Sequence, residues 1–367
     1  MTDTLQQVRA YHQRSKHYLD AYARGPETLD WDHQPDPFRR FTAAALQQLP
    51  LIGTTQLAAV AAFNRSAVGA LLELSMGLSA WKQFGPQRWA LRCNPSSGNL
   101  HPTEAYVIAN GIEDLTDGVY HYAAQAHALE QRAVFEPRAA TQQLLIGLSS
   151  IPWREAWKYG ERAFRYVQLD VGHAIGAIRY AAGVLGWQVT LVPLPDEHLA
   201  ALLGLDRDAD FSGAERENPD VLLHIQPKAA VSAVHYTQPA QWTGCANALG
   251  GLPRNEWSII EQMVSATRRV DAETVVPSRS SYAPAIAASR SPSDWIGLIK
   301  QRRSAQAFSP ETSSLSNAVF YRMLNAVLPR ASQCPWDSWN LPAHLHLLLF
   351  VHRVEGLPPG LYLLPRR

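Results

Sequence analysis

Cysteine is scarce in this chain, and the few cysteines present are not arranged for a shared structural role. The 367 residues include Cys93, Cys245 and Cys334, which lie far apart and form no Cys-x-x-Cys pair. Disulfide-stabilised small folds and structural zinc sites both need closely or regularly spaced cysteines. The sequence therefore predicts neither a disulfide framework nor a metal site.

The sequence also lacks an excess of charge of either sign. It has 33 lysines and arginines against 32 aspartates and glutamates, whereas proteins that bind nucleic acid or anionic membranes usually carry a basic excess. The apolar run near 345–351 is far too short to cross a bilayer. The first twenty residues lack the apolar stretch and cleavage site of a signal peptide. We therefore expect a cytoplasmic protein without a nucleic-acid or membrane partner.

What the sequence does contain is a mixture of helical and strand-like apolar patterns typical of an α+β protein. Hydrophobic residues make up 46% of the chain and charged residues 18%, so a sizeable core is expected. Apolar residues at three- and four-residue steps indicate helices, and short β-branched or aromatic runs between turn residues indicate strands. The predicted helices are 54–81, 161–185 and 254–267, and the predicted strands are 104–110, 118–122, 187–191 and 220–225. Gly172 and Gly176 lie one turn apart on the helix 161–185, where another backbone could approach closely.

An internal repeat indicates a second copy of part of this pattern. The run Asn99-Leu100, a strand, and Leu115-x-x-Gly118-Val119-Tyr120 recurs as Asn340-Leu341, a strand, and Leu357-x-x-Gly360-Leu361-Tyr362. The second copy contains no counterpart of the helix 161–185. We expect a first domain at 1–230, a connecting helix and Pro/Ser/Ala-rich linker at 231–292, and the start of a second, incomplete domain at 293–367. We also expect the natural chain to extend past Arg367.

A short basic segment precedes each copy. These segments are Arg14-Ser15-Lys16 in the first and Arg302-Arg303-Ser304 in the second. Arginine and lysine next to a hydroxyl suit a phosphate group, because they offer several charge-assisted donors within three residues. The alternative is an ordinary solvated helix face.

A loop of small and polar residues, Pro95-Ser96-Ser97-Gly98-Asn99, precedes the strand 104–110. Backbone N–H groups and hydroxyls in such a loop can approach the polar edge of a flat ring closely, because small side chains leave room. An ordinary turn before a strand is the alternative.

The adjacent pair Lys158 and Tyr159 lies in a tryptophan-rich segment just before the helix 161–185. A lysine near apolar walls can serve as a general base, and a neighbouring tyrosine can orient a substrate or assist the proton transfer. The alternative is a surface lysine beside a packed tyrosine.

Taken together, these segments resemble the nitroreductase superfamily, and within it the SagB-type, azoline-dehydrogenase-like branch in its tandem-domain form. The segment from Arg302 to Phe308 is similar to the family's R-R-S-x-R-x-F opening, and residues 14–17 are similar to a shorter form of it. Residues 95–99 match the family's P-S-S-x-N loop, and residues 157–160 resemble its W-K-Y-G segment. Gln306 departs from the opening motif, and residues 336–340 read Trp-Asp-Ser-Trp-Asn in place of P-S-S-x-N, which puts a second flavin site in doubt.

The resemblance implies an FMN-dependent oxidoreductase with a mostly antiparallel sheet flanked by long helices. It assigns the phosphate of FMN to the basic segments, the flavin ring to residues 95–99, and proton transfer to Lys158 and Tyr159. It also implies a homodimer or an intramolecular pseudo-dimer. We expect a small heterocyclic or peptide-borne substrate. The alternatives are an NAD(P)H-dependent nitro or quinone reductase and a flavin-free scaffold in a biosynthetic complex. No G-x-G-x-x-G motif follows a strand, which favours FMN over FAD.

Overall fold

The computed structural model divides the chain into two compact units, Met1–Glu273 and Thr274–Arg367. The residues that the structure describes are 2–53, 60–135, 142–227, 233–237, 239, 241–250, 257–272, 282, 292–309, 314–330, 333–339 and 341–366.

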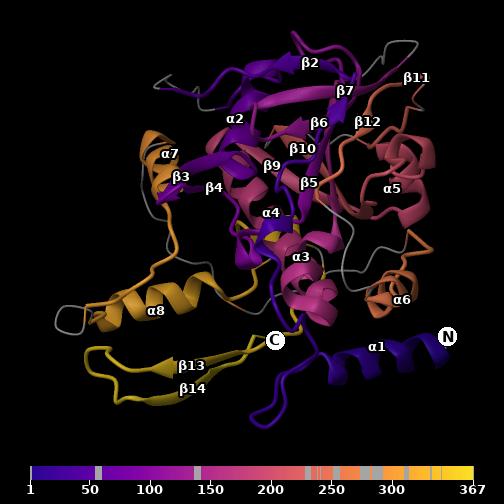
Figure 1. Ribbon diagram of the computed structural model, residues 1–367. Coiled ribbons are helices and arrows are strands. Elements are labelled where there is room, and N and C mark those ends of the chain that lie inside the picture. Colours follow the sequence, from indigo (N-terminus) through magenta and orange to yellow (C-terminus); the bar gives the residue numbers. More distant parts are fainter. Residues whose placement is uncertain are drawn as a thin grey trace. The chain divides into compact units, whose positions relative to one another are not determined.

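The first unit is built on one antiparallel sheet (Figure 1). Within the described residues this sheet has eight strands, and every strand pair in it is antiparallel. The predicted strands at 104–110, 118–122, 187–191 and 220–225 are confirmed as its β5, β6, β9 and β10. The order across the sheet is β11 (Gln241–Trp242), β7 (Ala128–Val134), β6 (Gly118–Ala123), β5 (Thr103–Asn110), β8 (Gln143–Ser150), β10 (Asn218–Pro227) and β9 (Trp187–Val192), and β2 (Ala45–Gln48) also pairs with β7.

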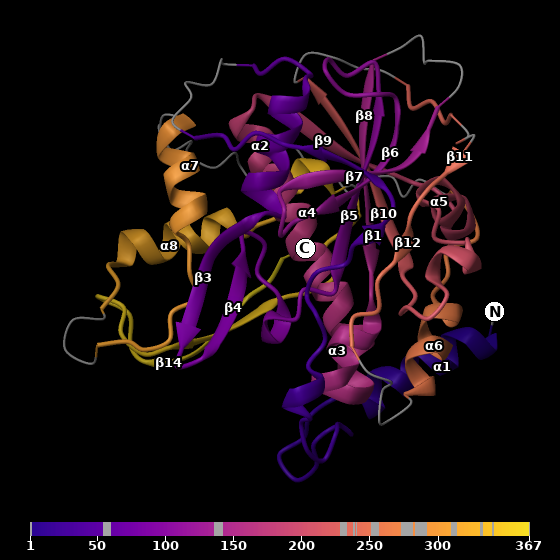
Figure 2. The ribbon, with the colours of Figure 1, turned by 45° about the horizontal axis from the view of Figure 1, so that its top comes forward.

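Helices cover both faces of this sheet. The long helix α4 (Ala163–Val184) contacts β5, β8 and β9 on one face and packs against α2 (Arg65–Ser75). The helix α5 (Asp196–Leu203) contacts β10 on the opposite face, as Figure 2 shows. The predicted helix 161–185 is therefore confirmed. It forms because its apolar residues, spaced by three and four positions, make one buried stripe: Val167, Val171, Ile175, Ile178 and Ala182.

The predicted helix 54–81 is wrong over much of its length. Residues 54–59 lie outside the described residues, α2 begins at Arg65, and it ends at Ser75. Asn64 starts the helix by accepting a hydrogen bond from the backbone N–H of Ala67. Beyond Gly77 the apolar residues belong to a hairpin of β3 (Leu78–Phe84) and β4 (Gln87–Arg92). Apolar spacing alone did not separate the end of the helix from a strand that follows it directly.

Residues 241–272, which the sequence analysis assigned to a connecting segment, contribute elements to the first unit. The strand β12 (Cys245–Ala246) pairs with β1 (Phe41–Thr42), and β11 joins the main sheet. The helix α6 (Ser258–Ala266), which lies within the predicted helix 254–267, contacts the N-terminal helix α1 (Thr2–Arg14) and also α4. The remaining elements of this unit are α3 (Pro152–Tyr159) and the short 3-10 helices at Trp31–His33, Ser97–Asn99, Gly160–Arg162 and Asp208–Phe211.

The described residues of the second unit form two helices and one hairpin. They are α7 (Pro292–Gln301), α8 (Asn317–Ala326), and the antiparallel strands β13 (Leu347–Val351) and β14 (Gly360–Leu364), with a 3-10 turn at Trp336–Ser338. The helix α7 begins at the boundary between the expected linker and the expected second domain, and it ends before Arg302. Most of the predicted linker 276–292 lies outside the described residues.

Candidate functional site

The loop at residues 95–99 connects the hairpin β3–β4 to the central strand β5. Gly98 adopts a left-handed backbone conformation (φ +62°), which a glycine adopts without strain. Asp170 on α4 holds the loop: its carboxylate accepts hydrogen bonds from the Ser97 backbone N–H at 3.1 and 3.2 Å and from the Ser97 hydroxyl at 2.9 Å. The loop is therefore fastened to the long helix by a buried carboxylate.

Lys158 and Tyr159 lie directly against this loop. They form the last turn of α3, whose end contacts the 3-10 turn Ser97–Asn99. A Cβ atom built on Gly98 would lie 2.7 Å from the Tyr159 hydroxyl and 3.2 Å from Cδ of Lys158. The structure thus brings together two sets of predicted site residues that are about 60 positions apart in the sequence, a placement that spacing alone does not give.

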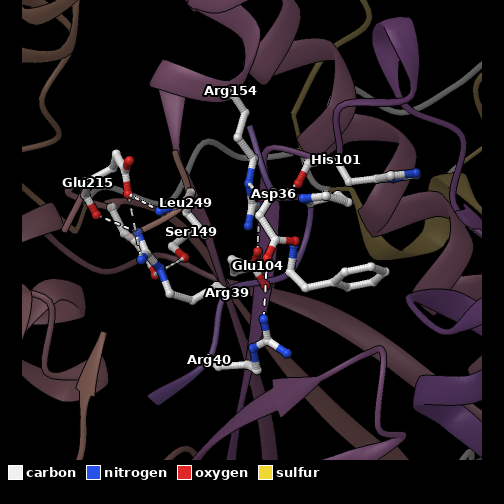
Figure 3. A network of polar contacts seen from close by, with 12 residues as sticks. Asp36, Arg39, Arg40, His101, Glu104, Ser149, Arg154, Glu215 and Leu249 are labelled. Atoms are coloured by element: carbon white, nitrogen blue, oxygen red, sulfur yellow. Dashed lines mark hydrogen bonds and ion pairs between the residues drawn. The ribbon is translucent and has the colours of Figure 1, made fainter. Parts of the chain in front are cut away.

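A buried arginine positions α3 relative to the loop. Arg154 lies one helical turn before Lys158, and its side chain has no solvent exposure. Its guanidinium donates to the backbone carbonyl of His101 at 2.7 Å, to the Glu104 carboxylate, and to the carbonyl of Asp36 at 3.1 Å (Figure 3). These contacts connect α3 to the end of the loop and to β5, so the position of the Lys158–Tyr159 turn depends on a buried ion pair.

The predicted basic segment of the first unit lies at the start of α4. Arg14 makes a two-pronged ion pair with Glu161, with 2.7 Å between its Nε and the carboxylate. Ser15 is buried; its carbonyl accepts from Arg162 and its hydroxyl accepts from Arg165 at 2.8 Å. The Nζ of Lys16 donates to the Gln13 side chain at 3.0 Å. Arg162 and Arg165 therefore contact Ser15 directly, its chain neighbours Arg14 and Lys16 add two further cations, and Glu161 is the acid paired with Arg14.

Tyr166 connects the basic cluster to the loop region. Its ring lies 4.3 Å from the Tyr159 ring, centre to centre, and the guanidinium of Arg162 lies 5.2 Å from its centre. Contacts therefore run continuously from Gly98 through Tyr159, Tyr166 and Arg162 to Ser15. The predicted residues of the first unit occupy the two ends of this chain of contacts.

Arg302, Arg303 and Ser304 belong to the second unit and are exposed after the end of α7. Arg303 donates to the backbone carbonyls of Lys300 and Arg302, at 2.8 and 2.7 Å. These contacts are local to the end of α7.

Two buried carboxyl groups of the site were missed by the sequence analysis. Asp170 was missed because a single acid on a long helix is usually part of the solvated polar face. In the structure this one is buried. Glu155 is buried on α3, one turn before Lys158, and neither of its oxygens has a hydrogen-bond partner among the described residues. Burial, reinforced by the nearby charge of Asp170, raises the pKa of Glu155 to about 9. Burial likewise raises the pKa of Tyr159 to about 12. Both groups therefore carry protons at neutral pH.

Metal and membrane functions gain no support within the described part of the chain. No group of three or more histidine, cysteine, aspartate or glutamate side chains there is placed to hold a metal ion. None of the described helices is both long and apolar enough to cross a membrane.

Comparison with known proteins connects this geometry to one fold. A protein of Methanocaldococcus jannaschii, provisionally named a nitroreductase, is 32% identical over 104 residues, which are 25% of this chain and 52% of that protein. The chain thus spans about half the length of this curated relative. The crystal structure of a protein from Anabaena variabilis, also provisionally named a nitroreductase, matches 97% of this chain and 76% of its own, with a TM-score of 0.72 and 22% identity. The fold is nitroreductase-like.

A further solved structure is less similar to this chain. An Escherichia coli microcin synthetase complex with truncated pro-MccB17 bound is similar over 62% of this chain and 82% of its own, at 15% identity and a TM-score of 0.35. A score this low carries no argument about shared function. No family model matches the chain. The expected α+β fold with a mostly antiparallel sheet is confirmed by the Anabaena structure.

Proposed function

We propose that the chain is an FMN-dependent oxidoreductase of the nitroreductase type. Within that class, we propose azoline dehydrogenation of a small heterocyclic or peptide-borne substrate. The observation that carries the proposal is the contact of Gly98 with Tyr159 and Lys158. It supports the proposal because Lys158 and Tyr159, to which the family resemblance assigns proton transfer, lie against the loop that it assigns to the flavin.

The residues of the first unit fit the chemistry of FMN. The cations around Ser15 outnumber the neighbouring acid, and the buried Nε of Arg165 has no partner among the described residues. A phosphate at this cluster would satisfy that donor, since arginine forks suit phosphate oxygens. Arg14 is already paired with Glu161, so Lys16, Arg162 and Arg165 carry the larger share of the proposed phosphate binding. The polar loop 95–99 would hold the ring edge.

The protein's own residues would supply proton transfer and would position the substrate. FMN, when bound, supplies the capacity to accept a hydride from the substrate. In the proposed reaction Nζ of Lys158 would take a ring proton from the azoline, and loss of that proton together with the hydride that bound FMN would accept would leave the aromatic azole. Tyr159 remains protonated and donates its hydroxyl hydrogen to orient the substrate. Asp170 and Arg154 keep the two sides of the site at a fixed separation.

Reduction of a nitro or quinone compound with NAD(P)H is the second candidate. The archaeal relative named a nitroreductase favours it. This reaction needs no protein base of the kind proposed for Lys158. The two candidates therefore differ in how much turnover depends on that residue.

We also propose that the second unit is a partial second copy of the first. In one hairpin Ile108 pairs with Val119 and Ala109 with Gly118; in the other Phe350 pairs with Leu361 and Val351 with Gly360. The two registers are the same at an offset of 242 residues. In each unit, moreover, the residue at or just before a helix N-cap bridges to the hairpin loop: Asn64 to Glu113 before α2, and Leu315 to Val354 before α8. These likenesses support a pseudo-dimeric arrangement or a homodimer. On α4, ideal Cβ atoms at Gly172 and Gly176 would have no other described atom within 4 Å outside the backbone of their own helix, which leaves room for a partner there.

The purified protein provides the test. A yellow protein that releases FMN, identified by mass spectrometry, would support the cofactor, and release of FAD would refute it. Turnover of an azoline-containing peptide would favour the dehydrogenase. Rapid oxidation of the reduced flavin by nitroaromatic compounds, without azoline turnover, would favour the reductase. A colourless protein that takes up no flavin on reconstitution would indicate a flavin-free scaffold.

A further inference from the structure

The hairpin β3–β4 stands outside the main sheet. It forms a two-stranded sheet of its own, and within the described residues neither strand pairs with any other strand. Backbone N–H and C=O groups on the outer edges can therefore pair with a further extended chain, except at Ala90, whose carbonyl already accepts from Asn99. Such an edge is a ready template for strand addition.

Three large aromatic side chains of the hairpin are exposed. Trp81 is 41% exposed, Phe84 78% and Trp89 36%. The pairing of Lys82 with Trp89 and of Trp81 with Ala90 places the two tryptophans on opposite faces of the ribbon. A hairpin that only needed protection from aggregation would carry charge without this aromatic surface.

The charge of the hairpin has one sign. Residues 78–92 contain Lys82, Arg88 and Arg92 and no aspartate or glutamate. Arg88 lies over the Trp81 ring at 4.2 Å, and no described carboxylate is within ion-pair distance of Lys82 or Arg88. This basic stretch contrasts with a chain whose charges are balanced overall, at 33 basic against 32 acidic residues. Arg88 is exposed and Lys82 is half-buried, so both can meet a negatively charged partner, whereas Arg92 is buried.

The base of the hairpin is joined to the candidate site. The side-chain amide of Asn99 donates to the carbonyl of Ala90 at 2.9 Å. Asn99 is the last residue of the loop that contacts Tyr159 through Gly98. A segment lying along the hairpin would therefore end beside that loop.

We propose that the hairpin β3–β4 is the docking surface for an extended acidic polypeptide segment that also carries aromatic side chains. The segment pairs with a free hairpin edge, its carboxylates face Lys82 and Arg88, and its rings pack on Trp81, Phe84 and Trp89. Docking here adds a polypeptide partner to the proposed function. The docking itself does not depend on the proposed function. Only a reaction of the docked segment at the loop 95–99 rests on that function.

Fluorescence anisotropy of labelled polymers tests this docking without any turnover. The probe is a fluorescein-labelled random copolymer of glutamate and tyrosine. Polyglutamate tests charge alone, a lysine–tyrosine copolymer reverses the charge, and a single-stranded oligothymidylate tests nucleic acid. We expect the glutamate–tyrosine copolymer to bind more tightly than any of the other three, by about tenfold or more.

Variants then locate the binding. The Lys82→Glu/Arg88→Glu variant should weaken copolymer binding by about tenfold or more, and Trp89→Ala should weaken it severalfold. Arg9→Glu, an exposed charge reversal on α1, should leave it unchanged. If the double reversal proves unstable by circular dichroism, Lys82→Gln/Arg88→Gln replaces it and should still weaken binding.

Three results would overturn the proposal: equal binding by polyglutamate, tighter binding by the oligothymidylate, or full binding by the double variant. FMN content is measured on the same samples. Loss of docking with flavin retained would refute only the docking surface, and docking without flavin would refute only the proposed chemistry.

Discussion

Asp170 on α4 accepts hydrogen bonds from both the backbone N–H and the hydroxyl of Ser97, so one buried carboxylate holds two donors of the loop 95–99. Burial raises the pKa of Asp170, and the hydrogen bonds from Ser96 and Ser97 oppose that effect. The ionised carboxylate is the better acceptor for these donors. The negative charge of Asp170 on α4 thus positions the loop.

Replacing Asp170 by alanine should loosen the loop and weaken cofactor binding. A buried hydrogen bond to a charged group is worth roughly 1.5–3 kcal/mol, so we expect a loss of that order in the free energy of unfolding. Flavin affinity, measured by fluorescence titration, should fall as well. Gln168→Ala, an exposed position on the same helix, is the control and should change neither quantity. Unchanged stability and affinity in Asp170→Ala would show that Ser97 is held by other contacts.

Gly98→Ala should be more disruptive than the same change at Gly85. Both glycines have a positive φ, at +62° and +57°, so alanine is strained by about 1 kcal/mol at either position. At Gly98 the new Cβ would lie 2.7 Å from the Tyr159 hydroxyl, whereas at Gly85 no described residue beyond its chain neighbours lies within 4 Å. Thermal unfolding should show a small loss for Gly85→Ala and a larger one for Gly98→Ala, and turnover should fall only for Gly98→Ala. Equal turnover in the two variants would mean that the contact with Tyr159 has no part in function.

Of the eight described strands of the central sheet, β5, β6, β9 and β10 were predicted from the sequence, whereas β2, β7, β8 and β11 were not. The strands β5 and β6 are dense in apolar residues between turn residues, which is a strong signal. In β7 the polar residues Glu130 and Arg132 interrupt that pattern, although both are buried in ion pairs with His121 and Asp210. In β8 a glycine, Gly147, looks like a break. It is needed there because a Cβ would lie 2.6 Å from Leu203 of α5.

The separate segments of the candidate site could be predicted from the sequence, but the contacts between these segments could not. Local motifs identified the loop and the Lys158–Tyr159 pair. Their contact depends on Asp170 and Arg154, whose partners lie between 50 and 118 residues away along the chain. Long-range ion pairs leave no periodic pattern in a sequence. For the same reason the pairing of Arg14 with Glu161 was not foreseen.

Lys158→Ala should separate chemistry from cofactor binding. The residue is not part of the basic cluster around Ser15, so flavin content and the unfolding midpoint should be retained. Azoline turnover should fall by about two to four decades, the usual contribution of a positioned base. Lys158→Arg should not restore it, because a guanidinium stays protonated and cannot accept a proton. Steady-state rates decide between the candidates: wild-type turnover in Lys158→Ala would make the residue structural and favour the nitro or quinone reductase.

Buried ion pairs around His121 should limit the pH range of stability. Its two ring nitrogens lie 2.8 Å from Glu130 and 3.1 Å from Glu104. Burial alone would lower the pKa of His121, but these bonds outweigh it and raise the pKa from 6.5 to about 9. Burial would raise the pKa of Glu104, but Arg154 and His121 lower it from 4.5 to about 2.

The sign of each contribution follows from these shifts. The stabilisation from His121 is complete below pH 6.5 and is lost as the pH rises through about 9. The stabilisation from Glu104 is complete above pH 4.5 and is lost as the pH falls through about 2. Urea unfolding across this range should show a maximum between the two limits. His121→Gln should remove the share of the loss between pH 6.5 and about 9 that comes from His121, and His198→Gln, an exposed control on α5, should leave the curve unchanged. An unaltered curve in His121→Gln would refute the assignment.

Glu155 should respond to neutralisation in the opposite way to Glu217, although both are buried glutamates. Glu217 is fully engaged: it accepts from Arg39 at 3.0 Å, from Tyr106 at 2.9 Å and from Ser149 at 2.7 Å. Glu217→Gln would leave the buried charge of Arg39 without its closest carboxylate. Breaking a buried pair in this way costs roughly 3–5 kcal/mol of unfolding free energy.

Glu155 has no such partner among the described residues, and burial, with Asp170 nearby, raises its pKa from 4.5 to about 9. Folding therefore favours its protonated form, so stability should decline as the pH rises from about 4.5 towards 9. Glutamine matches the neutral acid in size. Glu155→Gln should accordingly change stability at neutral pH by no more than about 1 kcal/mol, or increase it, and should flatten that decline. Urea unfolding of both variants at three pH values, with infrared detection of the carboxylic acid band that Glu155→Gln should lack, provides the measurement. A loss in Glu155→Gln as large as that in Glu217→Gln would mean that Glu155 is ionised and paired, and that Lys158 shares α3 with a charged neighbour.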